Sequence, residues 1–361
     1  MLRERFEGRR VLVTGHTGFK GAWLTCWLAD MGADVFGFAL APEGPRSLYR
    51  DADVETVCHG TYGDIRILAD LRRAVREARP DYVFHLAAQS LVRKSYEEPL
   101  ATFDVNVMGT ANLLESLRLE KVPSRVVIVT SDKCYENRGW VHGYRELDRM
   151  GGHDPYSASK ALAELLVTSY RQSFFGTGDI RVATARAGNV IGGGDWASDR
   201  IVPDAMRALM AGRAIEVRNP ASIRPWQHVL EPLRGYLLLA ARLGDAGGAA
   251  LCEGWNFGPN SEGTATVRRL VESLIEAWGK GEWVDVSQAS APHEAATLTL
   301  AVDKARTSLE WLPAWDLRRA AAATVDWYKA FDAGARGTAL RTLTVAQITN
   351  YEEATVARGG R

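Results

Sequence analysis

The sequence contains few cysteines, no long apolar run and no excess of charge of either sign. No hydrophobic stretch approaches the roughly 20 residues of a membrane-spanning helix, and the first residues lack the apolar segment of a secretory signal. We therefore expect no membrane partner. The 44 basic residues balance the 44 acidic ones, which argues against nucleic acid as a partner because binding it favours a basic excess.

The four cysteines are scattered, with no Cys-x-x-Cys pair and no spacing typical of metal ligands. We therefore expect a reducing, cytoplasmic compartment and no structural metal. The cysteines are Cys26, Cys58, Cys134 and Cys252.

The order of apolar segments predicts an α/β fold. With 361 residues, 46% of them hydrophobic, the chain can form a large domain and a smaller one. Its first two-thirds alternates short β-rich runs with helical stretches such as Ala22–Met31 and Leu68–Ala78. This alternation predicts a Rossmann-type, doubly wound parallel sheet, followed by a smaller C-terminal α/β domain. The expected strands are Arg10–Thr14, Asp34–Phe38, Val54–His59, Tyr82–Leu86, Val126–Thr130 and Arg181–Arg186.

A glycine-rich loop follows the first expected strand and precedes an apolar helix. Its glycines, Gly15, Gly18 and Gly21, would let the backbone turn tightly and approach a pyrophosphate, and the helix N-terminus would offer free N–H groups to that anion. An ordinary glycine-rich turn is the alternative interpretation. The position between strand and helix favours a dinucleotide site that also includes Thr17, Phe19 and Lys20.

The GxxGxxG spacing of this loop resembles that of the short-chain dehydrogenase/reductase superfamily. That resemblance implies that Asp64 and Ile65 hold the adenine, and that Leu86-Ala87-Ala88-Gln89 and Thr130 line the rest of the cofactor. An acidic residue should end the second strand if the cofactor is NAD, but this strand ends Phe38-Ala39-Leu40. Residue chemistry alone therefore does not choose between NAD and NADP.

Tyr156 and Lys160 form the candidate catalytic pair. Pro155 begins the predicted helix, and a four-residue step puts the two side chains on one helical face. A nearby ammonium group and a positively charged nicotinamide would lower the phenol pKa from its usual value near ~10. Tyr156 could then accept a hydroxyl proton as hydride leaves for the cofactor.

Ser131, Asp132 and Lys133 follow the strand that precedes this helix. The Ser131 hydroxyl could hydrogen-bond the oxygen of the reacting hydroxyl group. An epimerase needs only Ser, Tyr and Lys, whereas an additional acid and base favour elimination, in which one group removes a proton and the other protonates a leaving hydroxyl. A solvated Asp-Lys pair at the end of a strand is the alternative.

Segments across nearly the whole chain resemble the CDP-glucose 4,6-dehydratase family of extended short-chain dehydrogenases. The most specific are Ser131–Asn137, Gly192-Gly193-Gly194-Asp195-Trp196 and Arg224–Pro232. The resemblance implies that Tyr156 takes the C4 hydroxyl proton, Lys133 removes the C5 hydrogen, and Asp132 protonates the departing C6 hydroxyl. It also implies tightly bound NAD that is regenerated in each cycle, a nucleotide-diphosphate sugar as substrate, and a role in deoxysugar and O-antigen biosynthesis.

The same resemblance assigns the substrate contacts mainly to the second half of the chain. Arginines suit a diphosphate because their planar fork binds two oxygens at once, although most surface arginines are merely solvated. The expected substrate-binding residues are Gln89, Asn189, Asp195, Trp196, Arg200, Arg218, Arg224, Trp226 and His293.

Glycine, proline, tryptophan and arginine become dense after Gly188, which suggests a domain boundary. We expect residues 1–188 to form the NAD-binding domain, with residues 230–258 returning to it. Residues 189–335 would form mainly the nucleotide-sugar domain, and residues 336–361 a C-terminal extension with a loose tail.

Two helical segments, Leu100–Leu119 and Tyr156–Phe174, have broad apolar faces. The resemblance implies a homodimer, or a tetramer, built on a four-helix contact between them; both faces could instead pack on the sheet. The alternatives for function are a dehydratase of another nucleotide sugar, a nucleotide-sugar 4-epimerase, and a cofactor-sensing binding protein.

Overall fold

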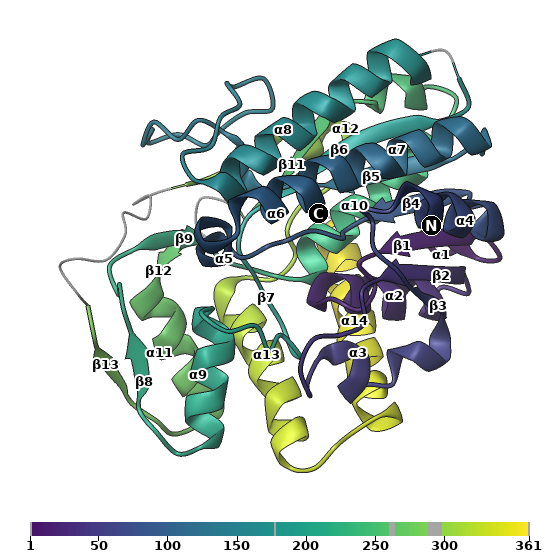
Figure 1. Cartoon of the computed structure of the whole chain (residues 1–361). Helices are drawn as coiled ribbons and strands as arrows, with labels where there is room; N and C mark the ends of the chain where they lie inside the picture. The colour runs from purple at the N-terminus through teal and green to yellow at the C-terminus, as the bar shows by residue number, and fades with distance from the viewer. Residues whose placement is uncertain (1, 177, 260–263, 288–297, 360–361) are drawn as a thin grey trace.

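The computed structural model describes residues 2–176, 178–259, 264–287 and 298–359. Its centre is a seven-stranded, fully parallel sheet in the order β11-β6-β5-β4-β1-β2-β3 (Figure 1). This order confirms the doubly wound parallel sheet. The strands are β1 Arg10–Thr14, β2 Asp34–Ala39, β3 His59–Tyr62, β4 Tyr82–His85, β5 Arg125–Val129, β6 Arg181–Ala187 and β11 Gly254–Phe257.

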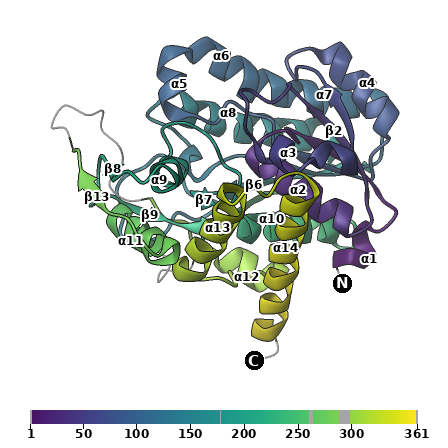
Figure 2. The same cartoon turned by 90° about the horizontal axis from the view of Figure 1, so that it is seen from below.

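Helices cover both faces of this sheet, and each face has its own apolar core. Helices α4, α7 and α8 pack on one face, and α1, α2 and α10 pack on the other. The final helices α13 and α14 lie beyond α2 and α10 (Figure 2). The bounds are α1 Leu2–Phe6, α2 Phe19–Asp30, α4 Leu68–Ala78, α7 Gly109–Glu120, α8 Pro155–Tyr170, α10 Leu230–Leu243, α13 Leu317–Asp332 and α14 Thr338–Gly359.

A smaller set of elements lies beside the carboxyl ends of the strands and contains three two-stranded sheets: β7 with β10, β9 with β12, and β8 with β13. Strand β11 joins the large sheet by pairing with β6, while the division at residue 188 stays a prediction. The bounds are β7 Val190–Ile191, β8 Ile215–Val217, β9 Ile223–Pro225, β10 Gln227–His228, β12 Thr264–Thr266, β13 Trp283–Asp285, α9 Ile201–Met210, α11 Val267–Trp278 and α12 Asp303–Leu309.

The remaining helical elements are short, and two of them continue longer helices. A π-helical turn, Asp104–Met108, joins α6 to α7, and a second, Arg171–Phe175, extends α8. The predicted helix Leu100–Leu119 is therefore three consecutive segments. The other bounds are α3 Leu48–Asp51, α5 Val92–Glu97 and α6 Pro99–Phe103, with 3₁₀ turns at Val54–Val57, Asp132–Cys134 and Gly248–Leu251.

The prediction of a strand at Val54–His59 is wrong. Asp53 adopts a left-handed conformation (φ 48°), the chain then makes a 3₁₀ turn over Val54–Val57, and Val54 is buried in the core. The strand itself begins at His59, at the edge of the sheet, and its four residues, His-Gly-Thr-Tyr, are largely exposed. An exposed edge strand has no buried apolar face and so gives no apolar pattern in the sequence.

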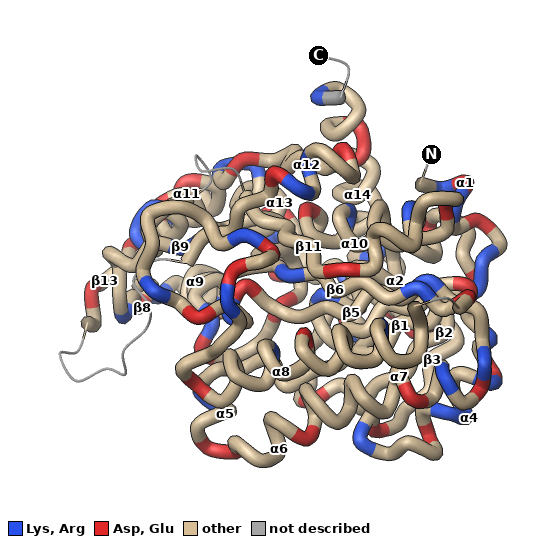
Figure 3. The backbone as a smooth tube through the Cα atoms, turned by 90° about the horizontal axis from the view of Figure 1, so that it is seen from above, with Lys and Arg blue, Asp and Glu red and all other residues tan. Residues whose placement is uncertain are grey.

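The expectation of a loose C-terminal tail is wrong as far as Gly359. Helix α14 extends to that residue, and its Leu340, Ile348 and Tyr351 side chains are fully buried. In the described part of the chain, no helix combines the length and apolarity needed to cross a membrane. Acidic and basic residues are interspersed over the molecule (Figure 3).

Candidate active site

A large cavity opens at the carboxyl ends of the central strands. Its volume is about 2180 Å³, and its walls come from the loops after β1, β3, β4, β5 and β6, from α8, and from the smaller group of elements. Strand order reverses at β1, which has β4 on one side and β2 on the other. Crevices at such switch points are where open α/β sheets bind ligands.

The glycine loop has the geometry expected of a pyrophosphate cradle. Gly15 has a φ of +78°, and a Cβ there would lie 2.6 Å from the Ala87 nitrogen; a Cβ on Gly21 would lie 2.0 Å from the Gly15 oxygen. Only glycine can therefore occupy these two positions without moving the backbone. Helix α2 begins within this loop, at Phe19 with Gly18 as its N-cap, and its first residues line the cavity, so its free N–H groups are available to an anion there.

Most residues predicted to bind a dinucleotide line this cavity. Asp64 is one of them, and its carboxylate accepts a hydrogen bond from Arg66 at 2.6 Å. This contact lowers the pKa of Asp64 below its usual range, although burial opposes the shift. The other predicted residues that line it are Gly15, Thr17, Gly18, Phe19, Lys20, Gly21, Ile65, Leu86, Ala87, Ala88, Thr130, Tyr156 and Lys160.

Gln89, predicted for both cofactor and substrate, is not part of the cavity wall. Its amide nitrogen donates to the Leu91 carbonyl and to Thr102 Oγ1, and its amide oxygen accepts from the Leu91 nitrogen at 2.6 Å. The side chain is thus engaged in shaping the loop that leads to α5. The structure does not support the prediction for this residue.

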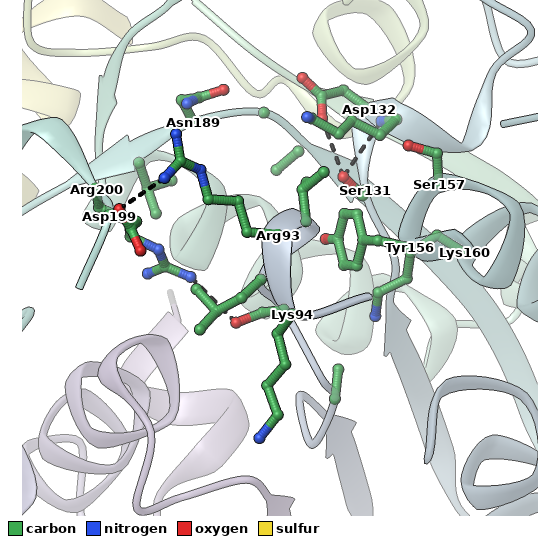
Figure 4. A pocket seen from close by; sticks show the side chains of 18 of the residues that line it. Arg93, Lys94, Ser131, Asp132, Tyr156, Ser157, Lys160, Asn189, Asp199 and Arg200 are labelled. Carbon is green, nitrogen blue, oxygen red and sulfur yellow. Dashed lines mark hydrogen bonds and ion pairs between the residues drawn. The ribbon is translucent and has the colours of Figure 1, made fainter. Parts of the chain in front are cut away.

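Tyr156 and Lys160 lie on the buried face of α8, at the end of the cavity where β5 terminates (Figure 4). Asp154 caps the helix by accepting from the Ser157 nitrogen at 2.9 Å. Lys160 Nζ lies 3.4 Å from the Val129 carbonyl, and burial lowers the pKa of its ammonium to about 8. The pair is therefore held rigidly by a capped helix.

The tyrosine pKa differs from the expected direction. In the protein alone, burial raises the pKa of Tyr156 to about 12, although a hydrogen bond with Ser131 opposes the shift. A phenol 8% exposed loses the hydration that would stabilise its anion. The expected lowering by Lys160 is not seen.

Asp132 and Lys133 form a short 3₁₀ turn after β5, with Ser131 as its cap. The Ser131 hydroxyl donates to Asp132 Oδ1 at 3.0 Å and accepts from the Lys133 nitrogen at 3.2 Å (Figure 4). Asp132 is 3% exposed, and burial raises its pKa although Lys133, Ser131 and Lys20 oppose the shift. A carboxyl group that retains its proton can act as a general acid, and Lys133 lines the same cavity.

A buried ion pair beneath this site was not predicted from the sequence. Glu164, on α8, accepts from Arg186 Nη2 at 2.9 Å and from the hydroxyls of Thr130 and Thr184 at 2.5 and 2.6 Å. Thr130 follows β5, while Thr184 and Arg186 belong to β6. One carboxylate therefore ties the catalytic helix to both strands. A Glu and an Arg 22 positions apart carry no local signal of this contact.

The predicted substrate residues have three different environments. Asn189, Asp195, Arg200, Arg218, Arg224 and Trp226 line the cavity. Trp196 is not part of its wall: the indole nitrogen donates to Asp51 at 2.8 Å, and the ring packs against Tyr328 and Phe331. The prediction for Trp196 is therefore not supported, because its ring is engaged in the apolar core. His293 lies outside the described residues.

Arginines and acidic residues pair across the mouth of the cavity. Arg200 contacts Asp195 at 3.0 Å and donates to the Ser90 hydroxyl at 3.1 Å. Arg93, on α5, contacts the Asp199 carboxylate at 3.1 Å (Figure 4). Arg218, after β8, contacts the same carboxylate at 2.9 Å. Arg93 and Asp199 were not predicted from the sequence. Among the described residues, no cluster of His, Cys, Asp or Glu could hold a metal ion.

The cavity suits a dinucleotide in its shape and donors: glycine positions that admit no side chain, a helix N-terminus, and a buried Tyr-Lys pair. Comparison with known proteins supports this. Residues 12–324 match the family model described as GDP-mannose 4,6 dehydratase. The CDP-glucose 4,6-dehydratase of Salmonella typhimurium (strain LT2) is 47% identical over 357 residues, covering 97% of this chain and 98% of that protein.

Solved structures agree with this assignment. DesIV, a dTDP-glucose 4,6-dehydratase from Streptomyces venezuelae crystallised with NAD and TYD, has a TM-score of 0.76 and 26% identity, covering 89% of this chain and 97% of that one. The epimerase Mth375 from Methanothermobacter thermautotrophicus has a TM-score of 0.78 and 25% identity, covering 92% and 95%. The chain therefore belongs to the GDP-mannose 4,6 dehydratase family, the nucleotide-sugar dehydratases of the short-chain dehydrogenase type.

Proposed function

We propose that this protein is a CDP-glucose 4,6-dehydratase that uses NAD and releases a CDP-4-keto-6-deoxy sugar. The observation that carries the proposal is the buried, hydrogen-bonded Asp132 next to Lys133 in the cavity wall that also contains Tyr156 and Lys160. The 47% identical relative bears the same name. An epimerase, which exchanges configuration at C4, would need no such acid and base.

In the proposed reaction, Tyr156 accepts the proton of the C4 hydroxyl, with Ser131 as its hydrogen-bond partner. Because burial raises the phenol pKa, this step relies on the positive charge of a bound nicotinamide ring, which would favour the phenolate. Bound NAD would supply the hydride acceptor at C4 and later the donor to C6. The C4 ketone acidifies the C5 hydrogen, which Lys133 removes, and Asp132 gives its proton to the C6 hydroxyl, which leaves as water. Asp132 is suited to this step because burial favours its neutral form. Hydride return to C6 is accompanied by return of a proton from Lys133 to C5, which completes the 4-keto-6-deoxy sugar. The cofactor is regenerated, so it is needed only in catalytic amount.

NAD rather than NADP is part of the proposal. Its support is that solved relatives hold NAD: the DesIV structure and the dTDP-glucose 4,6-dehydratase of Bacillus anthracis. The proposal also divides the chain into an NAD-binding domain and a nucleotide-sugar domain. It assigns Arg200, Arg218 and Arg224 to binding the nucleotide sugar. A cytoplasmic location, expected from the unpaired cysteines, completes it.

We also propose that two copies associate through α6, α7 and α8. These helices form one edge of the molecule, where α7 and α8 run alongside each other (Figure 1). The outer surface of these helices and of the π-helical turns that continue them exposes large apolar side chains. These are Leu100, Met108, Leu162, Leu165 and Phe174, each more than 40% exposed.

To test the function, the full chain is incubated with NAD and, separately, with the glucose or mannose derivatives of CDP, dTDP, GDP and UDP. Mass spectrometry should show loss of one water from CDP-glucose and retained mass for the others. Loss of water only from another nucleotide sugar would transfer the proposal to that sugar. Retained mass with an inverted C4 would establish an epimerase instead.

The role of Lys133 is tested separately with Lys133→Ala in deuterated water. The variant should still oxidise C4, giving the absorbance of reduced cofactor, but should not incorporate deuterium at C5. Lys121→Ala, at an exposed site after α7, serves as the control and should exchange C5 as the native chain does. Full C5 exchange in Lys133→Ala would show that another group is the base.

A further inference from the structure

Lys20 places an ammonium group at the end of the cavity that is formed by the glycine loop. The tight turn and the backbone N–H groups of that loop do not themselves require a charged side chain at this position. Lys20 is the second residue of α2, it lines the cavity, and its side chain is partly buried. Nζ lies 5.9 Å from the ring centroid of Tyr236, a fully buried residue of α10. The side chain therefore extends inward, beneath the loop, and not into solvent.

The charged groups that act on Lys20 come from the reaction centre. Burial lowers its pKa to about 8; the positive charges of Arg200 and Lys160 act in the same direction, and Asp132 opposes them. These groups belong to the segment before α9, to α8 and to the turn after β5. The contact with Tyr236 places the ammonium on that side of the cavity: the Tyr236 ring lies 5.7 Å from that of Phe257, which pairs with Ala187 at the carboxyl end of β6. Gly188 follows, and a Cβ there would lie 2.7 Å from Asp132 Oδ2, so Lys20 extends toward the end of the sheet that carries the turn after β5.

We propose that Lys20 holds a positive charge beside the reactive ring of the bound dinucleotide and thereby favours its reduced form over its oxidised form. The inference rests on the proposed function, because it requires a nicotinamide cofactor whose reactive ring lies near Tyr156 and Lys160. The oxidised ring is positively charged and the reduced ring is neutral, so a neighbouring ammonium repels only the former. Lys20 would thus promote hydride removal from C4 and retain the keto sugar long enough for water to leave.

A contact between Lys20 and the pyrophosphate is the competing explanation, and the two differ in a measurable way. A pyrophosphate contact would stabilise NAD, NADH and ADP-ribose alike, since all three contain the same diphosphate. A charge beside the reactive ring would weaken only NAD, and would leave ADP-ribose, which lacks that ring, unaffected. The ratio of the NAD and NADH dissociation constants therefore separates them.

The experiment measures the dissociation constants of NAD, NADH and ADP-ribose for the full-length native chain, Lys20→Met and the distant control Lys121→Met. Methionine retains the length of the side chain and removes its charge. We expect the ratio of the NAD dissociation constant to the NADH dissociation constant to be at least about tenfold lower in Lys20→Met than in the native chain. The dissociation constant of ADP-ribose should not change. Lys20→Arg, which keeps the charge, should retain the native ratio, and Lys20→Gln replaces Lys20→Met if the latter does not fold.

Two further readouts sharpen the test. In the native chain the ratio of the NAD and NADH dissociation constants should move toward that of Lys20→Met between pH 7 and pH 9, as the Lys20 amine loses its proton. Lys160 loses its proton in the same range. Because Lys20→Met retains Lys160, any pH dependence of the ratio in that variant measures the contribution of Lys160. On addition of substrate, a smaller fraction of cofactor should accumulate in the reduced form in Lys20→Met.

Three outcomes would overturn the inference. If Lys20→Met bound NAD, NADH and ADP-ribose more weakly by the same factor, Lys20 would be assigned to the pyrophosphate. If the ratio of the NAD and NADH dissociation constants did not change, Lys20 would have no electrostatic effect on the reactive ring. A native chain that binds neither nicotinamide form would reject the proposed function itself and the inference with it. The first two outcomes leave the dehydratase proposal intact.

Discussion

The ion pair between Glu164 and Arg186 gives a sharp prediction about what holds the catalytic helix to the sheet. The two side chains are 3% and 5% exposed, and Arg186 contacts both carboxylate oxygens at 2.9 Å. Replacing Glu164 with glutamine keeps the volume but removes the charge, which leaves the buried Arg186 without its counterion. It also removes one of the two carboxylate oxygens that accept from Thr130 and Thr184.

The expected cost follows from burial. Breaking a buried pair by removing one partner destabilises a protein by about 3–5 kcal/mol. With an unfolding entropy of about 2.1 cal/mol/K per residue over 361 residues, this lowers Tm by about 4–7 °C if the chain unfolds as one unit. The matched control is Glu276→Gln: its pair with Arg318 is 58% and 72% exposed, so its loss should cost about 0–1 kcal/mol.

The pH dependence follows from the direction of the shift. Burial opposes the charge of Glu164, but Arg186 and the threonine hydroxyls outweigh it and hold the pKa of Glu164 below its usual range. Its contribution is therefore complete above the unfolded-state pKa of about 4.3 and is lost as the pH falls through the lower native value. The difference in Tm between native and Glu164→Gln should stay constant from pH 7 to pH 5 and narrow below about pH 4.

Thermal unfolding followed by circular dichroism measures these differences. A Tm decrease in Glu164→Gln no larger than that in Glu276→Gln would refute the reasoning, because it would mean that the buried Arg186 is satisfied without its carboxylate. A difference that changed between pH 7 and pH 5 would refute the assigned pKa direction.

Two other predictions concern association and the C-terminal helix. Leu165→Asp should sediment as a monomer at concentrations where the native chain and Val356→Asp, altered at an exposed position on α14, sediment as dimers; unchanged mass in Leu165→Asp would contradict the proposed dimer surface. Glu231, on α10, accepts from the Tyr351 hydroxyl at 2.6 Å and the Trp315 nitrogen at 2.7 Å, and burial raises its pKa to about 7. Because the native state then binds a proton that the unfolded state releases, stability should fall as pH rises from about 5 to 7; the Tm of the native chain relative to Glu231→Gln should fall over that range, and a constant difference would exclude the titration.

The features predicted correctly from the sequence are those with a local cause. Strand β1, whose predicted bounds match the structure, is a continuous apolar run. It is followed directly by a loop with glycines at positions where any side chain would collide with the backbone. Helix α4 has an apolar stripe at helical spacing, and its bounds also match the prediction. In these segments, neighbours in sequence are neighbours in space, so composition and periodicity contain the required information.

The features that the sequence did not reveal depend on contacts between distant segments. The amide of Gln89 is taken by Thr102 and the Leu91 backbone, and the indole of Trp196 by Asp51 and two aromatic rings. Helix α14 docks through Tyr351, whose partner Glu231 is 120 positions away.

The sequence by itself determined the parallel sheet, the glycine loop and the four-residue step from Tyr156 to Lys160, because each is specified within one or two consecutive elements. Only the tertiary structure decided which candidate side chains face the cavity, that burial raises the pKa of Asp132, and that Lys20 extends toward the reaction centre. Exposure and charge environment arise from how β5, α8 and the segment before α9 meet at one end of the sheet, and no single stretch of residues contains that information.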